Sequence, residues 1–343
     1  MESYILPFFV AAFISLIMTP LVRRLAIKIG ALDIPKDDRR VHNKPMPLIG
    51  GLAIYIAVIV ASLLFLPIDK SLTSIIVGGT IIVCSGIIDD MKGMSPKVKL
   101  IFQILAGLIL IFGDVKVDFI TNPFSSNNIL LDLKWFSIPI TLFWIVGITN
   151  TLNLIDGLDG LSAGVAMISS LSLMLVAGKF ENINVTILSG IVGGACLGFL
   201  PYNFNPAKIF MGDTGALFLG FMLAAISIEG VMKSVATIAI IVPILILGVP
   251  IFDTTFAIFR RLLSGQSIVS ADKGHLHHRL LNKGFSQRQT VLILYGISAV
   301  FGIFAVIVAK ANSKQAVYLS VILFLVTILV SAKLGLFQKN TKK

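Results

Sequence analysis

The sequence predicts an all-α integral membrane protein, and three observations carry this prediction. Of its 343 residues, 56% are hydrophobic and only 13% are charged, whereas about a quarter of the residues in an average soluble domain are charged. Apolar stretches long enough to cross a hydrocarbon core, about 17–25 residues, recur along the whole chain. Basic residues gather in alternate breaks between these stretches. We therefore expect a single polytopic membrane domain over residues 1–343.

Stretch length and polar breaks predict about eleven transmembrane helices. They are expected near residues 3–22, 48–67, 71–88, 97–113, 136–152, 160–178, 184–200, 213–229, 235–253, 290–309 and 316–335. No basic segment precedes the first stretch and no small-residue cleavage site follows it, so we expect a retained helix and not a signal peptide. An odd number of helices puts the two termini on opposite sides of the membrane.

The distribution of basic residues predicts the orientation of the protein in the membrane. Cytoplasmic loops carry an excess of Lys and Arg, and most of the 28 such residues fall inside if the N-terminus is outside and the C-terminus is cytoplasmic. Basic loops facing an anionic leaflet explain the net charge of +11, so we expect no nucleic-acid partner. The same topology places all four histidines and most aspartates on the cytoplasmic side. The expected active-site loops lie at about 23–47, 89–96, 153–160, 201–212 and 254–289.

The first and last of these loops are the longest. They mix apolar and basic residues without low complexity, so they predict short amphipathic helices at the membrane interface.

An adjacent pair of acids, Asp89 and Asp90, ends the third predicted helix. Anions at a helix C-terminus face the unfavourable end of the helix dipole. This position costs energy unless a metal ion, a lysine or a substrate proton compensates. A solvated helix end is the alternative, but acids at a membrane boundary favour a functional role.

A second cluster places four polar side chains at intervals of three, at Asn150, Asn153, Asp156 and Asp159. Neighbours at this spacing share a helix face, and the glycines after the two acids predict a break in the helix. A helix cap needs only one such residue. This cluster is therefore the most specific signal of a functional site in the chain.

A third cluster leads into the eighth predicted helix, with Asn203, Phe210 and Asp213 as its candidate residues. Asp213 has the position of an N-cap. The glycines on both sides of it allow close backbone approach to a ligand, and a helix N-terminus suits phosphate. Asp213 can therefore be both the N-cap of this helix and part of a ligand site.

The fourth cluster contains His275, His277, His278 and Arg279 in the last long loop. No cysteine or glutamate lies at a spacing that would complete a zinc site, and the neighbouring Lys273 and Arg279 favour an anion. A solvated basic loop explains the basic residues but not three histidines. Asp253 and Asp272 are expected to be caps or loop acids.

Carboxylates, amides and cations at one membrane surface predict phosphoryl transfer, in which a metal ion and cations neutralise charge that spreads over oxygens. Mg²⁺ suits oxygen ligands and needs only one or two carboxylates besides phosphates. The absence of a Walker-type loop from the sequence disfavours an ATPase. An ion-coupled transporter is the main rival from another class, but its site belongs near the bilayer midplane.

Four motifs, in this order, resemble the polyprenyl-phosphate N-acetylhexosamine-1-phosphate transferases, integral enzymes that begin bacterial cell-envelope polymers. The motifs are Asp89-Asp90-Met-Lys92, Asn150-x-x-Asn153-x-x-Asp156-Gly-Leu-Asp159-Gly, Phe210-Met-Gly-Asp213-Thr-Gly and His275-Leu-His277-His278. The resemblance covers nearly the whole chain. It implies transfer of a sugar 1-phosphate from a UDP-sugar to undecaprenyl phosphate, with Mg²⁺ or Mn²⁺ and release of UMP.

The resemblance also implies roles for individual residues. Asp213 would be the principal metal ligand, and the Asp89–Asp90 pair would handle the lipid phosphate or act as base. Asp156, Asp159 and Asn203 would surround the nucleotide, and the histidine motif would bind the diphosphate or sugar phosphate. Lys44 in the first cytoplasmic loop matches an active-site lysine of the family.

Leu276 separates the histidines, whereas the muramoyl-pentapeptide transferases of this family carry three in a row. The sequences around Lys44 and His275 are similar to those of the UDP-N-acetylglucosamine enzymes of teichoic-acid synthesis. We therefore expect UDP-GlcNAc as the donor, with UDP-MurNAc-pentapeptide as the alternative. The expected location is the bacterial cytoplasmic membrane, with the active site on its cytoplasmic face, lipid as a partner and a homodimer allowed.

Overall fold

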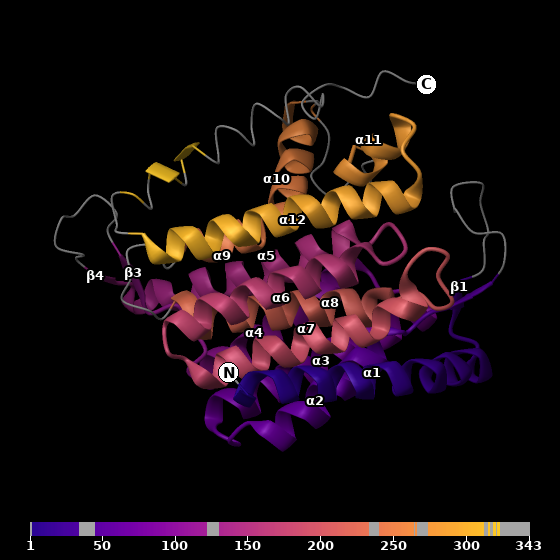
Figure 1. Cartoon of the computed structure of the whole chain (residues 1–343), viewed down its shortest axis with the longest axis horizontal. Helices are drawn as coiled ribbons and strands as arrows, with labels where there is room; N and C mark the ends of the chain where they lie inside the picture. Colours follow the sequence, from indigo (N-terminus) through magenta and orange to yellow (C-terminus); the bar gives the residue numbers. More distant parts are fainter. Residues whose placement is uncertain are drawn as a thin grey trace.

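Helices make up almost all regular structure in the computed structural model (Figure 1). It describes residues 2–33, 45–121, 130–232, 240–263, 265, 274–311, 315, 318–319 and 321–322. The helices are α1 (Glu2–Ile29), α2 (Gly51–Phe65), α3 (Lys70–Lys92), α4 (Pro96–Phe112), α5 (Ser137–Ile155), α6 (Leu161–Lys179), α7 (Ile183–Asn203), α8 (Gly212–Ser227), α9 (Ile241–Ile246), α10 (Gly248–Leu263), α11 (Leu276–Asn282) and α12 (Gln287–Lys310). A 3₁₀ turn, η1 (Lys134–Phe136), precedes α5, and a π-helical turn, η2 (Ile228–Met232), follows α8.

Seven of the described helical segments are long and apolar enough to cross a membrane. They are Tyr4–Ile29, Lys70–Lys92, Lys134–Ile155, Leu161–Lys179, Ile183–Asn203, Gly212–Met232 and Gln287–Lys310. This confirms the predicted class, an all-α multi-pass membrane protein. The number of eleven helices and the orientation of the termini stay predictions.

Two of the expected segments differ most from the prediction. The second, expected at 48–67, is the shorter helix α2, whereas α4 matches the segment expected at 97–113. Residues 316–335 lie almost wholly outside the described residues. The segment expected at 235–253 is divided at Leu247, and α10 then continues to Leu263 inside the predicted loop 254–289. The loop 23–47 has no short helix of its own in its described part, because α1 continues to Ile29.

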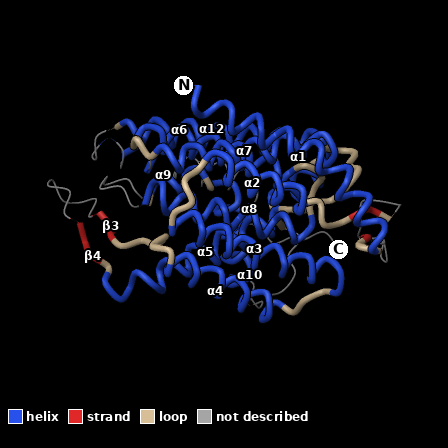
Figure 2. The backbone as a smooth tube through the Cα atoms, turned by 90° about the horizontal axis from the view of Figure 1, so that it is seen from below, coloured by secondary structure: helices blue, strands red, loops and turns tan. Residues whose placement is uncertain are grey.

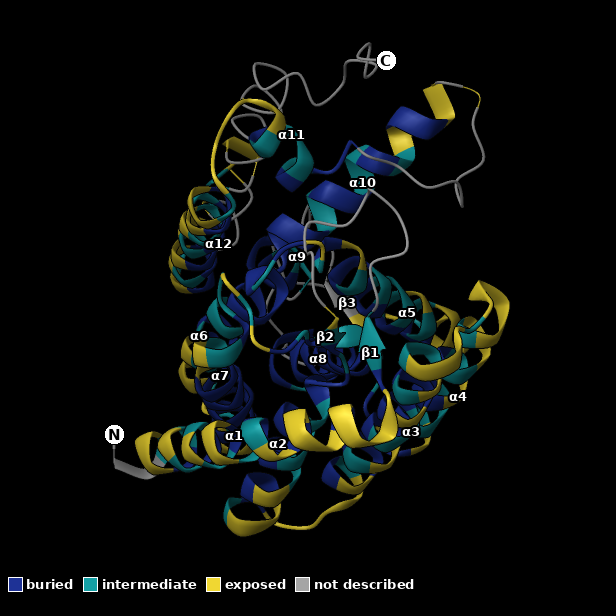
Figure 3. Ribbon diagram, turned by 90° about the vertical axis from the view of Figure 1, so that its right-hand side faces the viewer, coloured by how far each residue is buried: buried dark blue, intermediate teal, exposed yellow. Residues whose placement is uncertain are grey.

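Helix α8 lies at the centre of the molecule, with α3 and α5 packed against it (Figure 2). Its side chains from Thr214 to Ser227 are all buried. Small residues permit this packing, since a Cβ on Gly51, Gly86 or Gly220 would collide with α8 or with the helix that α8 touches. The ribbon seen end-on shows the same order, with buried residues in the middle and exposed ones on the outer helices (Figure 3).

Two short antiparallel ribbons complete the fold. Strand β1 (Leu32–Asp33) pairs with β2 (Met46–Pro47), and β3 (Phe119–Thr121) pairs with β4 (Leu130–Asp132). After β2, the backbone binds the segment that leads into α8: Phe210 N donates to Pro47 O at 2.9 Å, and Gly51 N donates to Met211 O at 2.9 Å. The first ribbon thus fixes the entry to α8.

Helix α7 presents a row of glycines to α1. A Cβ on Gly194 would collide with the carbonyl oxygen of Phe8, and one on Gly198 with the carbonyl oxygen of Ala12. Small residues spaced by four let membrane helices approach closely, and packing replaces the hydrophobic effect as the attraction between them.

Gly198→Ala is expected to lower the free energy of unfolding by about 1–3 kcal/mol, because the added methyl group has to push α1 away. Gly296→Ala in α12 is the matched control, since a Cβ there meets nothing within 4 Å. It should leave stability unchanged or raise it by up to ~1 kcal/mol through helix propensity. Thermal unfolding of the detergent-purified variants tests this; equal midpoints would contradict the packing argument.

Candidate active site

A cavity of about 400 Å³ opens at the end of the helices where α3 and α5 finish and α8 and α12 begin. This volume is in the range of small-molecule sites. Its lining includes most of the residues predicted from the sequence: Asp90, Asn153, Asp156, Asp159, Asn203, Phe210, Asp213 and His278. The predicted gathering of acids from distant motifs at one end of the molecule is therefore seen in the structure.

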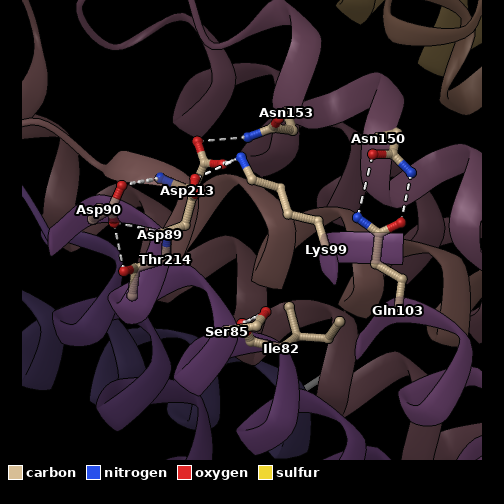
Figure 4. Close-up of polar contacts among 10 residues, drawn as sticks. All are labelled: Ile82, Ser85, Asp89, Asp90, Lys99, Gln103, Asn150, Asn153, Asp213 and Thr214. Atoms are coloured by element: carbon tan, nitrogen blue, oxygen red, sulfur yellow. Dashed lines mark hydrogen bonds and ion pairs between the residues drawn. The ribbon is translucent and has the colours of Figure 1, made fainter. Parts of the chain in front are cut away.

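Lys99 holds two of the predicted acids together (Figure 4). Its Nζ lies 2.5 Å from Asp89 Oδ2 and 2.5 Å from Asp213 Oδ2, so one ammonium bridges α3 and α8. All three side chains are largely buried. This lysine supplies the compensation that the C-terminal acids of α3 require. Sequence reasoning missed Lys99, although a charge inside an apolar segment was a signal in itself.

Asp90 binds the start of α8. Its Oδ1 accepts from Asp213 N at 2.9 Å, and its Oδ2 accepts from Thr214 N at 3.0 Å and from Thr214 Oγ1 at 2.6 Å. Gly212 turns the chain here with φ +71°, and a Cβ on it would collide with the Asp90 carboxylate. Both oxygens of Asp90 thus position Asp213, and a direct catalytic role for Asp90 stays a prediction.

The asparagines of the second motif have different surroundings. Asn153 Nδ2 donates to Asp213 Oδ1 at 3.0 Å, so it fixes the other oxygen of that carboxylate. Asn150 pairs with Gln103 through two side-chain hydrogen bonds, one helical turn beyond Lys99 (Figure 4). Asn150 therefore aligns α5 with α4 and does not line the cavity.

The loop between α5 and α6 carries Asp156 and Asp159. The helix breaks where the sequence predicted, with Asp156 ending α5 and Gly160 at φ +78° before α6. Gly160 N donates to Asn203 Oδ1 at 3.1 Å, and its carbonyl accepts from Tyr295 Oη. Asn203 Nδ2 also donates to Ile209 O at 3.0 Å, so both ends of this buried amide are engaged with backbone.

Asp159 is fixed by a small network that the sequence did not single out. Its Oδ2 accepts from Asn205 Nδ2 at 3.0 Å and from Ala207 N at 3.1 Å. The same Asn205 nitrogen donates to Gln287 Oε1 at 2.7 Å, and Gln287 lines the cavity. Gln287 Oε1 accepts the hydrogen bond from Asn205. The Nε2 group of Gln287 can therefore donate to another acceptor.

Asp156 lines the cavity without a hydrogen-bond donor among the residues that the structure describes. Burial raises the pKa of its carboxyl well above the ordinary value, and the negative charges of Asp213, Asp90 and Asp159 raise it further. Carboxylates crowded in this way favour a cation beside them.

The histidine motif divides between the protein interior and the cavity. His278 lines the cavity, whereas His275 and His277 are buried behind it. A Cβ on Gly157 would collide with His277 Nε2, so this imidazole packs directly on the acidic loop. The predicted contacts of His275 and His277 with substrate stay predictions, and the side chain in the cavity wall is His278.

Two other candidates complete the set. Arg279 is half-buried, and its Nε donates to Gly274 O at 3.0 Å, next to the histidines. Lys44 lies outside the described residues.

The donors that line this cavity fit a hard divalent cation, since most are carboxylate oxygens, with side-chain amides and one imidazole beside them. In the described part of the chain, no group of three His, Cys, Asp or Glu side chains could hold a metal ion by itself. Mg²⁺ commonly binds through one or two carboxylates and completes its shell with water and substrate phosphates. Asp213 and Asp156 are the residues that would hold it.

The buried His277 predicts a pH dependence of stability. Burial, together with the neighbouring His278, lowers the pKa of its imidazole to about 3, whereas an unfolded histidine has a pKa near ~6.5. The unfolded state then binds an extra proton between these values. The stabilisation is complete above pH ~6.5 and falls toward pH ~3, by up to ~1.4 kcal/mol per pH unit.

His277→Gln should therefore flatten the decline of stability between about pH 6.5 and 4 relative to the unmodified protein. Asp156 has the opposite sign, since its raised pKa favours the folded state as the pH falls, but it contributes equally to both proteins. Unfolding temperatures measured at several pH values give the difference in slope. Identical slopes would show that His277 is not the group responsible.

Comparison with known proteins places the chain among enzymes of one kind. Residues 72–231 match the family described as Glycosyl transferase family 4. The chain is 43% identical over 343 residues, all of its length and 95% of the relative's, to a probable undecaprenyl-phosphate N-acetylglucosaminyl 1-phosphate transferase of Bacillus subtilis (strain 168).

Two further relatives are more distant. A decaprenyl-phosphate N-acetylglucosaminephosphotransferase of Mycolicibacterium smegmatis is 38% identical over 83% of this chain and 77% of its own. A phospho-N-acetylmuramoyl-pentapeptide-transferase of Halalkalibacterium halodurans is 32% identical over 89% of this chain and 95% of its own. The likeness to the Bacillus subtilis relative spans the whole chain and so includes the segments that build the cavity. The chain belongs to glycosyl transferase family 4, the polyprenyl-phosphate sugar-phosphate transferases.

Proposed function

We propose that this enzyme transfers N-acetylglucosamine 1-phosphate from UDP-GlcNAc to undecaprenyl phosphate and releases UMP, with Mg²⁺ or Mn²⁺ as cofactor. The observation that carries the proposal is the bridge of Lys99 between Asp89 and Asp213, the latter of which lines an acidic cavity at one end of the membrane helices. Such a site combines carboxylates for a metal ion with a cation for phosphate. The sugar and the lipid are proposed by similarity to the Bacillus subtilis relative, whose likeness spans the full chain.

The location follows from the same proposal. The cavity lies at one end of the helices, and the positive-inside distribution of Lys and Arg assigns that end to the cytoplasm. UDP-sugars are cytoplasmic nucleotides, so a cytoplasmic face of the bacterial cell membrane suits the donor. The acceptor reaches the cavity from the lipid that surrounds the helices.

In the proposed reaction a lipid phosphate oxygen attacks the phosphorus that bears GlcNAc. A new P–O bond forms to that phosphorus as its bond to the bridging oxygen breaks, and UMP leaves with this oxygen. A phosphate monoester has its second pKa near ~6, so the attacking group is largely dianionic at neutral pH and needs no strong base. A metal ion bound in the cavity supplies charge neutralisation to the diphosphate.

The protein's own residues orient these groups. Lys99 holds Asp89 and Asp213 close together, and Asn153 and Asp90 fix Asp213 from two further sides. Phe210 offers an aromatic surface in the cavity wall, and His278 and Gln287 offer hydrogen-bond donors to the substrate. Such preorganisation is the main contribution a protein makes to phosphoryl transfer.

The decisive experiment measures UMP from detergent-purified protein with undecaprenyl phosphate and either UDP-GlcNAc or UDP-MurNAc-pentapeptide, with EDTA or with excess Mg²⁺. We expect UMP with UDP-GlcNAc, its loss with EDTA and its return with Mg²⁺. UMP from the pentapeptide donor alone would establish the alternative donor. Substrate counterflow in liposomes without UMP would instead indicate a transporter, and a phospho-aspartyl enzyme would replace direct attack by a two-step route.

Asp213→Asn is expected to lower turnover by about 10²–10³-fold, because it removes the charge that both Lys99 and the proposed metal ion require. Its fold should persist, since the amide can still bind neighbouring groups. Asp114→Asn is the control, an exposed acid that pairs with Lys70 at the other end of α3 and α4. Near-normal UMP release by Asp213→Asn, with an unchanged unfolding temperature, would refute the assignment of Asp213.

A further inference from the structure

The histidine helix α11 is attached to the molecule through an aspartate that lies outside the cavity. Asp253, in α10, is only 8% exposed, and its two oxygens bind the start of α11. Its Oδ2 lies 2.8 Å from His275 Nδ1, and its Oδ1 accepts from Leu276 N at 2.7 Å. A carboxylate oxygen can only accept, so the proton of this contact is on Nδ1 of His275.

A second contact joins the same two elements. Arg260 lies two helical turns after Asp253, on the same buried face of α10. A Cβ on Gly274 would collide with the Arg260 guanidinium, so this arginine packs on the residue before His275. Helix α10 leans away from the rest of the helices, and α11 lies between it and α12 (Figure 3). Asp253 and Arg260 of α10 therefore fix the position of the start of α11.

The rings of His275, His277 and His278 connect Asp253 with the cavity, the first pair stacked and the second tilted. The His275 and His277 rings lie 5.8 Å apart at an interplanar angle of 6°, and the His277 and His278 rings lie 4.2 Å apart. His277 also packs against Gly157 of the acidic loop, and His278 is in the cavity wall. A shift of His275 would thus be passed to the group that faces the substrate.

We propose that Asp253 is a positioning residue of the active site, which fixes α11 so that His278 lies in the cavity, and that His275 is its donor partner and not a substrate ligand. The part that concerns turnover rests on the proposed function. Misplacement of a reacting group by about 1 Å can cost ~100-fold in rate. Asp253→Asn, which disturbs acceptance from His275, should lower turnover by about 10–100-fold.

A double-mutant cycle with His278→Ala separates positioning from a general loss of stability. If Asp253 acts by placing His278, Asp253→Asn should cost no more than about twofold in UMP release once His278 is absent. Full additivity of the two losses would overturn the proposal, as would normal turnover of Asp253→Asn. Thr254→Val is the matched control, a buried neighbour whose Oγ1 has no hydrogen-bond partner among the described residues; it should behave as the unmodified protein.

Substitutions of His275 give a second test that does not depend on the stability of Asp253→Asn. The side-chain nitrogen of asparagine can replace Nδ1 as donor, so His275→Asn should keep at least about tenfold more activity than His275→Ala. Equal losses in both would mean that the imidazole itself is needed, and would overturn the role as donor partner.

Hydrogen exchange tests the positioning even if the proposed reaction is wrong. Amides of residues 276–282 should exchange roughly tenfold faster in Asp253→Asn than in Thr254→Val, while α8 is unaffected. Unchanged exchange in 276–282 would overturn the positioning role. Failure of the unmodified protein to release UMP from UDP-GlcNAc would refute the proposed function alone.

Discussion

The N-terminus of α8 lies at the wall of the cavity, and its first backbone N–H groups have no acceptors within the helix itself. Asp90, from the end of α3, provides them through both of its oxygens. The contact is favourable for both helices, since the acids of α3 face the positive end of the α8 dipole as well as Lys99. Together with Lys99 and Asn153, this contact fixes Asp213 in the cavity wall.

A second set of contacts makes the acidic loop after α5 rigid. Asn203 accepts from Gly160 N, and Tyr295 donates to Gly160 O. His277 packs on Gly157, and Asn205 donates to Asp159. These groups come from α7 and the segment after it, α11 and α12, so the loop is supported by parts of the chain distant in sequence. Such support gives a catalytic loop the fixed geometry that phosphoryl transfer requires.

Several site residues could not be found from sequence because their signal is tertiary. Lys99 was assigned to an apolar helix, and only the packing of α3, α4 and α8 shows that its charge lies between two acids. In the sequence nothing distinguishes Asp253 from a helix cap, and only the structure shows that it binds the start of α11. Asn203 and Asp90 line the cavity as predicted, and the structure adds that their side chains also bind backbone groups. A motif records which residues are needed, and it does not distinguish contact with ligand from support of a residue that makes contact.

The sequence by itself determined the class of the protein, because apolar length and charge asymmetry respond directly to the bilayer as solvent. It also predicted that residues of the four motifs lie together at one end of the helices, and where the helix breaks before Gly160. The tertiary structure decided the course of the chain after residue 240, where α9 and α10 replace one long helix. It alone decided that Asp89 and Asp213 share Lys99, since residues 89, 99 and 213 meet only through helix packing, which periodicity along a single chain does not encode.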